Sequence, residues 1–363
     1  MTPSARRHIS ASGSGSAYDA GPSGGGERVR IVDLAQELQL SVATVSRALN
    51  HVPTVDDDIA QQVRDLAERR GYVANRLARS LRMRTPPFVG FLVPDVENLA
   101  YSIAVDACAK YVGQLGYQLI LVISGDDSAS EYAALRSLAE AQVAGLIVAP
   151  SPDMSEESRA LLAGRSVVQF NRDCGLSDYT VVCDDRPAFA DATRHLLELG
   201  HTRFAYVGTT DVVSNGRDRL EGVRGELSRA GRRLSNASTR LLPPTETDGY
   251  AAAYELFTTG SRPTALVVGS SNLSMGVARA VRELGIAIPQ EMSLVVYGDD
   301  RWGGLYEPGL TTITAPYREM ARTVADIVTE LLSGGRRPRR GPVRLPAELV
   351  IRGSIAPAPP RSR

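Results

Sequence analysis

Short apolar runs alternate with helical patterns along most of the chain, and this alternation restricts the fold more than any other feature. Runs of strand length stand at 88–93, 118–123, 145–149 and 166–170, and again at 203–208, 265–269 and 293–297. Helical patterns separate them at 102–115, 131–141, 218–230 and 273–284. The alternation predicts an α/β core of parallel sheets covered by helices, in two lobes. Ligands of such folds bind at the carboxyl ends of strands, so we expect a site in the cleft between the lobes.

A different pattern precedes this core, because the stretch from Leu34 to Asn50 predicts two short helices joined by a tight turn. Apolar residues recur at helical spacing before the turn, at Ile31, Leu34, Ala35 and Leu38. Leu40 closes the turn, and Ser41 is suited to accept an amide as the N-cap of the second helix. Val45, Ala48 and Leu49 are then expected to face the first helix, as in a helix-turn-helix.

The outer face of this second helix is the candidate surface for reading DNA. It carries Val42, Ala43, Thr44, Ser46 and Arg47. In a helix-turn-helix the N-terminal part of the second helix meets base edges. Arg47 is able to pair with guanine O6 and N7, whereas Val42 and Ala43 offer apolar contact to thymine methyl groups. An ordinary helical hairpin with a solvated arginine is the alternative.

A third helix and a basic segment follow. The helix is predicted from an N-cap at Asp56 to Arg70, ending at Gly71. From Arg69 to Arg84 there are six arginines and no acid. Such a segment is too short and too charged to form a stable isolated helix, so it needs a partner to become ordered. A polyanion is one partner, with Leu81 as a wedge in the minor groove; a flexible basic linker is the alternative.

Several motifs now occur in order: D-L-A at 33–35, S-x-x-T-V-S-R-x-L-N at 41–50, G-Y-x-x-N at 71–75 and A-R-S-L at 78–81. The chain therefore resembles the LacI/GalR family of transcription regulators, and the resemblance continues to about Ser354. It implies paired hinge helices over the operator centre, a leucine at Leu81 that opens a base step, and a core like that of periplasmic sugar-binding proteins. The residues expected to contact DNA are Ser41, Val42, Ala43, Thr44, Ser46, Arg47, Asn50, Asn75, Arg76, Ala78, Arg79, Leu81 and Arg82.

The resemblance also implies effector-binding positions in the cleft. Asp95 and Asn98 stand in the loop after the first core strand, and Tyr101 is expected either to stack on a sugar ring or to be a core aromatic at a helix start. Arg219 matches an arginine that binds effector hydroxyls or carboxylates in many members. The full expected set is Asp95, Asn98, Tyr101, Arg172, Asp184, Arg219, Ser270, Gly298 and Asp299.

Three segments depart from the family pattern. Ser270 stands where relatives usually have asparagine, and counting places Gly298 at the usual ligand aspartate, although a shift of one residue restores Asp299. A pocket without this asparagine and this aspartate lacks two polar partners for sugar hydroxyls, which argues against a typical hexose as the effector. The effector is then a different sugar or a small anion, or there is none. In the helix-turn-helix domain, called the head below, Asp57 and Asp58 stand in the first turn of the third helix, where family members often have basic residues. We therefore expect fewer contacts to DNA phosphates there.

Composition agrees with these predictions. Formal net charge is zero, but residues 28–85 hold ten arginines against seven acids, so positive charge is concentrated where phosphate binding needs it. No apolar run is long enough to span a bilayer and no signal peptide is evident, so we expect a cytoplasmic protein. Cys108, Cys174 and Cys183 lack ligand-like spacing and are expected to be reduced thiols, with no metal and no cofactor.

We expect five segments: a disordered tail at 1–27, the helix-turn-helix domain at 28–74, a hinge helix and linker at 75–87, the two-lobe core at 88–355 and a tail at 356–363. The Arg- and Pro-rich stretch at 336–345 is expected to be solvated, and added nonspecific affinity for nucleic acid is the alternative. The main hypothesis is a dimeric repressor that binds a palindromic operator and responds to a sugar or related metabolite. A solute-binding protein shares the core, and a sugar-acting enzyme is less favoured because no nucleophile elbow or P-loop occurs. We expect structural roles for His195 and His201.

Overall fold

The computed structural model describes residues 29–49, 54–72, 88–259, 262–298, 300–333 and 340–360. The contacts between residues divide the chain into two compact units, Met1–Arg82 and Met83–Arg363, and each unit is described separately. Within the described residues, no helix has both the length and the apolar character needed to cross a membrane.

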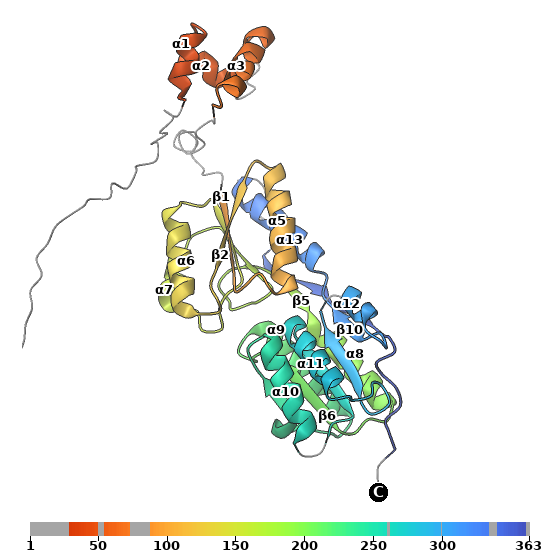
Figure 1. Ribbon diagram of the computed structural model, residues 1–363. Helices are drawn as coiled ribbons and strands as arrows, with labels where there is room; N and C mark the ends of the chain where they lie inside the picture. The colour runs from red at the N-terminus through yellow and green to blue at the C-terminus, as the bar shows by residue number, and fades with distance from the viewer. Residues whose placement is uncertain are drawn as a thin grey trace, which may run out of the picture. The chain divides into compact units, whose positions relative to one another are not determined.

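The described residues of the first unit, 29–49 and 54–72, form three short helices around one small core. These are α1 (Ile31–Glu37), α2 (Val42–Leu49) and α3 (Asp57–Arg69) (Figure 1). Their apolar stripes meet in a cluster of buried residues, as the helical spacing predicts. The cluster consists of Leu34, Ala35, Val45, Ala48, Ala60, Val63, Leu66 and Ala67.

The predicted caps of this head are present. The Thr44 amide donates to Ser41 Oγ at 3.0 Å, which caps α2. The Asp58 amide donates to the Asp56 carboxylate at 3.0 Å, which caps α3. Gln39 adopts a positive φ of 55° in the turn between α1 and α2, and that tight reversal brings α2 across α1.

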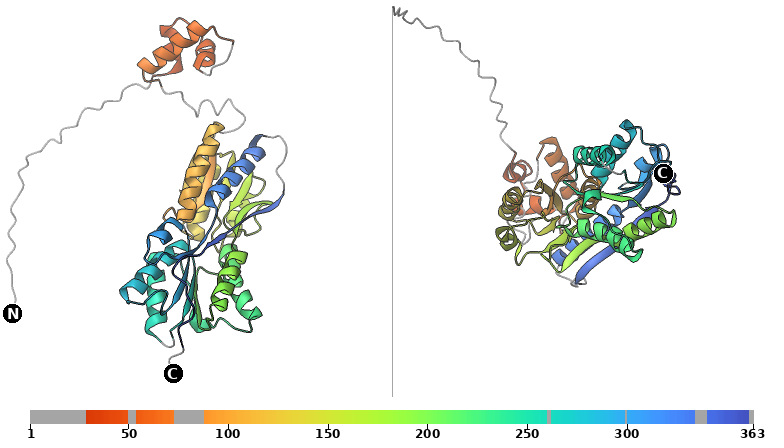
Figure 2. Two further views of the ribbon diagram at one scale, coloured as in Figure 1. Left: turned by 90° about the vertical axis from the view of Figure 1, so that its right-hand side faces the viewer. Right: turned by 90° about the horizontal axis from the view of Figure 1, so that it is seen from below.

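The second unit begins with a lobe built on six parallel strands in the order β11-β5-β4-β3-β1-β2. The helices α5 and α13 lie side by side on one face, and α6 and α7 cover the other (Figures 1 and 2). The strands are β1 (Phe88–Val93), β2 (Gln118–Ile123), β3 (Gly145–Val148), β4 (Val167–Phe170), β5 (Tyr179–Asp184) and β11 (Gly341–Pro346). The helices are α5 (Leu99–Gln114), α6 (Ser128–Glu140), α7 (Glu156–Leu162) and α13 (Tyr317–Ser333).

The second lobe repeats this plan with the order β12-β10-β9-β8-β6-β7, in which β12 alone runs antiparallel to its neighbour. Helices α8 and α9 pack together, as do α10 and α11. The strands are β6 (Phe204–Gly208), β7 (Thr239–Leu241), β8 (Ala265–Gly269), β9 (Ser293–Tyr297), β10 (Thr311–Thr314) and β12 (Glu348–Val350). The helices are α8 (Asp185–Glu198), α9 (Ser214–Arg229), η1 (Asn236–Ser238), α10 (Glu246–Thr258), α11 (Ser271–Glu283) and α12 (Asp300–Leu305).

The chain crosses between the lobes three times. It crosses from β5 to α8, from β10 to α13 and from β11 to β12. The two-lobe α/β architecture with parallel sheets is therefore confirmed. One cluster of buried side chains includes residues of both lobes, so the core is continuous through the crossings.

Several boundaries differ from the predictions. Helix α5 starts at Leu99 rather than near residue 102, because Asn98 Oδ1 accepts the Ala100 amide at 3.0 Å and caps the helix there. The expectation of a solvated stretch at 336–345 is wrong for its second half, since Gly341–Pro346 forms β11. This is an edge strand, where proline is tolerated because no further strand needs its amide.

The C-terminal tail also begins later than expected. The Ala356 amide donates to Ser293 Oγ at 3.0 Å, and the Ala358 amide donates to the Leu199 carbonyl at 2.8 Å. The last described residues therefore follow the second lobe, where Figure 2 shows the dark blue segment running beside it.

Candidate functional site

The head presents the predicted reading face on α2. Val45 and Ala48 are buried, whereas Ser41, Ala43 and Arg47 are exposed, which confirms the predicted orientation of the helix. Val42, Thr44 and Ser46 are half-buried beside them. Arg47 Nε donates to the Ala43 carbonyl at 3.2 Å, so its guanidinium is drawn toward the first turn of the helix. This is the part of a recognition helix that meets base edges.

Other predicted contact residues fall outside the described part of the chain. They are Asn50 directly after α2, then Asn75, Arg76, Ala78, Arg79, Leu81 and Arg82 in the hinge segment, and the predicted effector residue Asp299 in the core. At the start of α3, Asp57 and Asp58 are exposed. Their negative charges face solvent at a helix N-terminus, where they suit the helix dipole but not a phosphate.

The core contains an outer pocket of about 600 Å³ between its two lobes. The first lobe contributes the loops that follow β1, β2, β3 and β4, and the second lobe contributes the loops around β6, β7 and the start of α11. This is the cleft position that the fold predicts. The lining consists of Pro94, Asp95, Glu97, Gly125, Asp126, Pro152, Arg172, Thr209, Thr210, Val213, Leu241, Leu242, Pro243, Pro244, Thr245, Glu246, Asn272 and Met275.

Arg172 is held rigidly at the edge of this pocket. Its Nη1 and Nη2 donate to the two carboxylate oxygens of Asp126 at 2.5 and 2.8 Å, and Nη1 also donates to the Pro150 carbonyl. The Arg172 side chain is 8% exposed, and its Nε has no hydrogen-bond partner within the described protein. The charge of Arg172 is therefore balanced by Asp126, while its buried Nε is left without a partner among the described residues.

An inner cavity lies deeper between the lobes and measures only about 20 Å³. That volume suits about one water molecule. Unpartnered buried atoms face this region, among them Asn171 Oδ1 and Thr209 Oγ1. The lining consists of Asn98, Ala100, Tyr101, Asn171, Arg172, Thr209, Asn215, Arg219, Pro244, Ser270, Ser271, Tyr297 and Tyr317.

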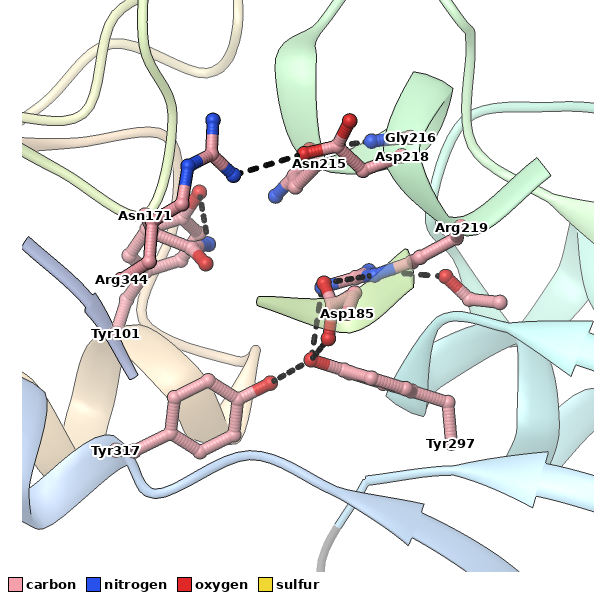
Figure 3. A network of polar contacts seen from close by, with 11 residues as sticks. Tyr101, Asn171, Asp185, Asn215, Gly216, Asp218, Arg219, Tyr297, Tyr317 and Arg344 are labelled. Atoms are coloured by element: carbon pink, nitrogen blue, oxygen red, sulfur yellow. Dashed lines mark hydrogen bonds and ion pairs between the residues drawn. The ribbon is translucent and has the colours of Figure 1, made fainter. Parts of the chain in front are cut away.

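A buried polar network fills the centre of the core. Arg219 Nε donates to Asp185 Oδ2 at 2.6 Å, and Arg219 Nη2 donates to the Tyr297 hydroxyl at 2.8 Å. That hydroxyl donates in turn to Asp185 Oδ1 and accepts from the Tyr317 hydroxyl. Figure 3 shows Asp185 between Arg219 and Tyr297, with the Tyr317 hydroxyl directed at that of Tyr297. Arg219 also lies over the Tyr297 ring, 3.9 Å from its centroid.

Burial and the neighbouring polar groups together set the protonation states in this network. Burial raises the pKa of Tyr297 well above its ordinary value despite the opposing effect of Arg219, so the phenol stays protonated and donates. Burial by itself would lower the pKa of Arg219, but Asp185, Tyr297 and Tyr317 together raise it well above its ordinary value. The network is therefore a neutral assembly built around one internal ion pair.

Aromatic side chains surround this network. The inner cavity itself is lined by Tyr101, Tyr297 and Tyr317, and Phe189 stacks on Tyr297 at a centroid distance of 5.8 Å. Tyr206 is buried in the second sheet, and a Cβ at Gly269 would lie only 2.2 Å from its hydroxyl oxygen, so only glycine fits beside this ring.

Direct contacts join the lobes around this network. The Asp173 amide donates to Ser214 Oγ at 2.8 Å. Arg344 on β11 forms an ion pair of 3.2 Å with Asp218 on α9, as Figure 3 also shows. These contacts and the Tyr317–Tyr297 hydrogen bond hold the two sides of the cleft together.

The structure separates the predicted effector residues into three groups. Asp95 lines the outer pocket, and Arg172 lines both the outer pocket and the inner cavity. Asn98, Ser270 and Arg219 line the inner cavity. Tyr101 contributes only its hydroxyl end, which accepts from Asn171 Nδ2 at 3.2 Å. Its ring is 2% exposed and packs edge-on against Phe170, so the core-aromatic alternative describes it and stacking on a sugar does not.

The other two described positions differ from expectation. Asp184 ends β5 and lines neither cavity, whereas its neighbour Asp185 carries the buried carboxylate. Gly298 also lines neither cavity. Its φ is +141°, and a Cβ there would lie 2.9 Å from Ser271 Oγ, so this backbone position does not accommodate an aspartate side chain without movement.

Sequence reasoning missed Asp185, Asp126, Tyr297 and Tyr317. The pair Asp184-Asp185 was visible in the sequence, but which carboxylate turns inward depends on the crossing from strand to helix. His201, expected to be structural, is buried and bridges Thr264 Oγ1 and Ser293 Oγ at 3.0 and 2.9 Å.

The chain combines a helix-turn-helix whose second helix is exposed with a two-lobe core that has a pocket in its cleft. This combination defines a class of protein, the DNA-binding transcription regulators that have a ligand-binding core. A family model described as a periplasmic binding protein-like domain matches residues 193–355. The chain is 30% identical over 345 residues to the HTH-type transcriptional regulator MalR of Streptomyces coelicolor, covering 91% of this chain and 97% of the relative. It is 28% identical over 331 residues to the HTH-type transcriptional regulator GalR of Escherichia coli, covering 90% and 95%.

Solved structures agree with the fold. The lac repressor dimer bound to operator and the anti-inducer ONPF has a TM-score of 0.81 at 23% identity, covering 91% of this chain and 100% of that chain. A LacI family transcriptional regulator from Mycobacterium smegmatis has a TM-score of 0.66 at 25% identity, covering 74% and 99%. This chain belongs to the LacI/GalR family of transcriptional regulators.

Proposed function

We propose that the protein is a repressor that binds a palindromic operator as a homodimer and is modulated by a small molecule in the outer pocket. The observation that carries the proposal is the orientation of α2, which exposes Ser41, Ala43 and Arg47 while Val45 and Ala48 remain in the core. We assign base reading to Arg47, since arginine pairs with guanine in the major groove.

An exposed apolar edge supports the dimer. Leu121 and Ile123 are 37% and 51% exposed and lie two positions apart on β2, which is an edge strand of the first sheet. Adjacent exposed apolar side chains of this kind favour an interaction surface. A two-fold dimer presents the same helix to each half of its site, which accounts for a palindrome.

The proposal extends to the organisation of the chain. We assign 28–74 to DNA binding, 75–87 to the hinge and 88–355 to the effector-binding and dimerisation core, and we place Asn50, Asn75, Arg76, Ala78, Arg79, Leu81 and Arg82 at the DNA. A cytoplasmic location and the absence of catalysis fit this role. The named relatives are transcriptional regulators, which supports a regulator without enzymatic activity.

DNA selection tests the proposal. The full-length chain is incubated with a random DNA pool, bound sequences are amplified, and the mass of the complex is measured by analytical ultracentrifugation. We expect an enriched palindrome bound by two chains. Enrichment of no sequence, or of a single unrepeated half-site bound by one chain, would contradict it. Candidate metabolites are then screened for loss or gain of binding.

A further inference from the structure

The outer pocket has an unusual charge balance. Four carboxylates line it, from Asp95, Glu97, Asp126 and Glu246, and Arg172 is the single basic residue in its lining among the residues that the structure describes. Arg172 is bound through both terminal nitrogens to Asp126, so that pair is internally neutral. Three carboxylates remain, and they give the pocket a net negative charge.

These three carboxylates come from both lobes. Asp95 and Glu97 stand in the loop after β1, and Glu246 begins α10 in the second lobe. Asp95 Oδ1 accepts the Asn98 amide at 2.6 Å, which fixes that carboxylate in place. Glu246 has a contact of 3.4 Å with Arg279, but both side chains are about half exposed. A pair so exposed is weak and screened by salt, so it does not cancel the charge of Glu246.

Arg219 does not supply the missing positive charge. It lines the inner cavity rather than the outer pocket, and its guanidinium is committed to Asp185, to Tyr297 and to the Gly269 carbonyl at 2.9 Å. A carboxylate or phosphate ligand would have to compete with Asp185 for a buried arginine. It would also pass the acids of the outer pocket, which repel it.

The rest of the outer pocket is apolar. Its second-lobe wall is formed by Val213, Leu241, Leu242, Pro243, Pro244 and Met275. A volume of about 600 Å³ with such a wall and a few directed polar groups is typical of sites for small organic molecules. Arg172 and Thr209, which line this pocket and the inner cavity, each carry a buried polar atom without a partner among the described residues, namely Arg172 Nε and Thr209 Oγ1.

We propose that the outer pocket binds an amphipathic organic cation, a molecule with an apolar body and a protonated amine. The body packs on the wall of leucines and prolines, and the amine lies near the carboxylates of Asp95, Glu97 and Glu246. The assignment rests on the proposed function in one respect only, that the pocket is the effector site.

Matched probes that differ only in charge test this proposal. Tryptamine, tryptophol and indole-3-acetate share an indole body and carry a cation, no charge and an anion, and phenethylamine, 2-phenylethanol and phenylacetate form a second set. Binding to the full-length chain is measured by isothermal titration calorimetry at pH 7.5 and fixed ionic strength. We expect each amine to bind roughly five- to tenfold more tightly than its alcohol, and each acid to bind most weakly.

A triple variant locates the preference. Asp95→Asn, Glu97→Gln and Glu246→Gln together remove three charges but keep an oxygen that can accept the Asn98 amide. We expect this variant to bind amines and alcohols equally. The matched control is Glu140→Gln, Asp191→Asn and Glu198→Gln, which removes three exposed charges on helices outside the pocket and is expected to keep the preference.

The outcomes are decisive in both directions. The proposal is overturned if neither amine binds, if the acids bind as tightly as the amines, or if the triple variant keeps the preference for amines. DNA selection with the same preparation tests the proposed function separately, because the reading face on α2 contains none of these carboxylates. A chain that selects a palindrome but rejects amines would refute the ligand class alone.

Discussion

Arg219 and Asp185 form a buried ion pair with 2.6 Å between Nε and Oδ2, and their side chains are 5% and 0% exposed. Asp185 is the first residue of α8, where the chain first crosses from one lobe to the other. Tyr317, which follows the second crossing, joins the pair through Tyr297. Arg219, which the family resemblance assigns to effector binding, is thus paired with side chains of the protein. These side chains lie next to two of the segments that connect the lobes.

Removing the carboxylate from this pair is expected to destabilise the second lobe strongly. Asp185→Asn leaves Arg219 buried without a counter-charge, which typically costs about 3–5 kcal/mol in the free energy of unfolding. Urea unfolding followed by fluorescence of Trp302, the single tryptophan, measures this, because Trp302 packs against the core of the second lobe.

The control for this prediction is Asp106→Asn, which breaks the exposed 2.8 Å pair with Lys110. It is expected to cost less than about 1 kcal/mol. Equal losses in the two variants would mean that the buried pair is no more important to folding than a surface pair.

Truncating Arg47 is expected to relax sequence preference. Arg47→Ala removes the guanidinium that pairs with guanine, so discrimination at one base pair in each half-site falls by roughly 1–3 kcal/mol. The preference matrix from DNA selection measures this, with Arg136→Ala on α6 of the core as the control. An unaltered matrix in Arg47→Ala would assign base reading to other residues.

Leu81 is expected to contribute to operator affinity through deformation of the duplex. Leu81→Ala removes the apolar wedge that the family resemblance places between base steps, so the bent duplex loses its support. Affinity by gel shift and bending by circular-permutation assay are both expected to fall, while sequence preference in the half-sites stays the same. Unchanged bending in this variant would remove Leu81 from that role.

His201 is expected to make the second lobe less stable in mild acid. Burial lowers the pKa of His201 below its ordinary value of 6.5. In the unfolded chain, His201 takes up a proton below about pH 6.5, whereas in the folded chain burial opposes this. The free energy of unfolding therefore falls as the pH drops from about 6.5 toward the lower pKa of the folded state. The slope for one proton is at most about 1.4 kcal/mol per pH unit.

Urea unfolding at pH 7.5 and pH 5.5, monitored through Trp302, measures this slope. His201→Gln is expected to lose the part of the pH dependence that belongs to His201. His195→Gln, which changes a histidine with 37% side-chain exposure, serves as the control. An identical slope in wild type and His201→Gln would show that other groups cause the acid sensitivity.

Much of the local structure was predictable from the sequence. The caps at Ser41 and Asp56 and the burial of Val45 and Ala48 follow from spacing and side-chain type, since they involve neighbours within one or two helical turns. The alternating strands and helices of both lobes follow from the same kind of periodicity. The stretch at 341–346 was misjudged because its prolines and arginine resemble a loop, and only pairing with β5 makes it a strand.

The sequence by itself therefore determined the helix-turn-helix, the two α/β lobes and the place of the cleft, because local periodicity and capping govern these features. Only the tertiary structure decided the chemistry of the cleft. Asp185 reaches Arg219 across 34 positions and Tyr297 across 112, and which side chains meet at such distances depends on how strands and crossings are packed. The same packing closes the inner cavity with tyrosines and leaves the outer pocket with uncompensated carboxylates.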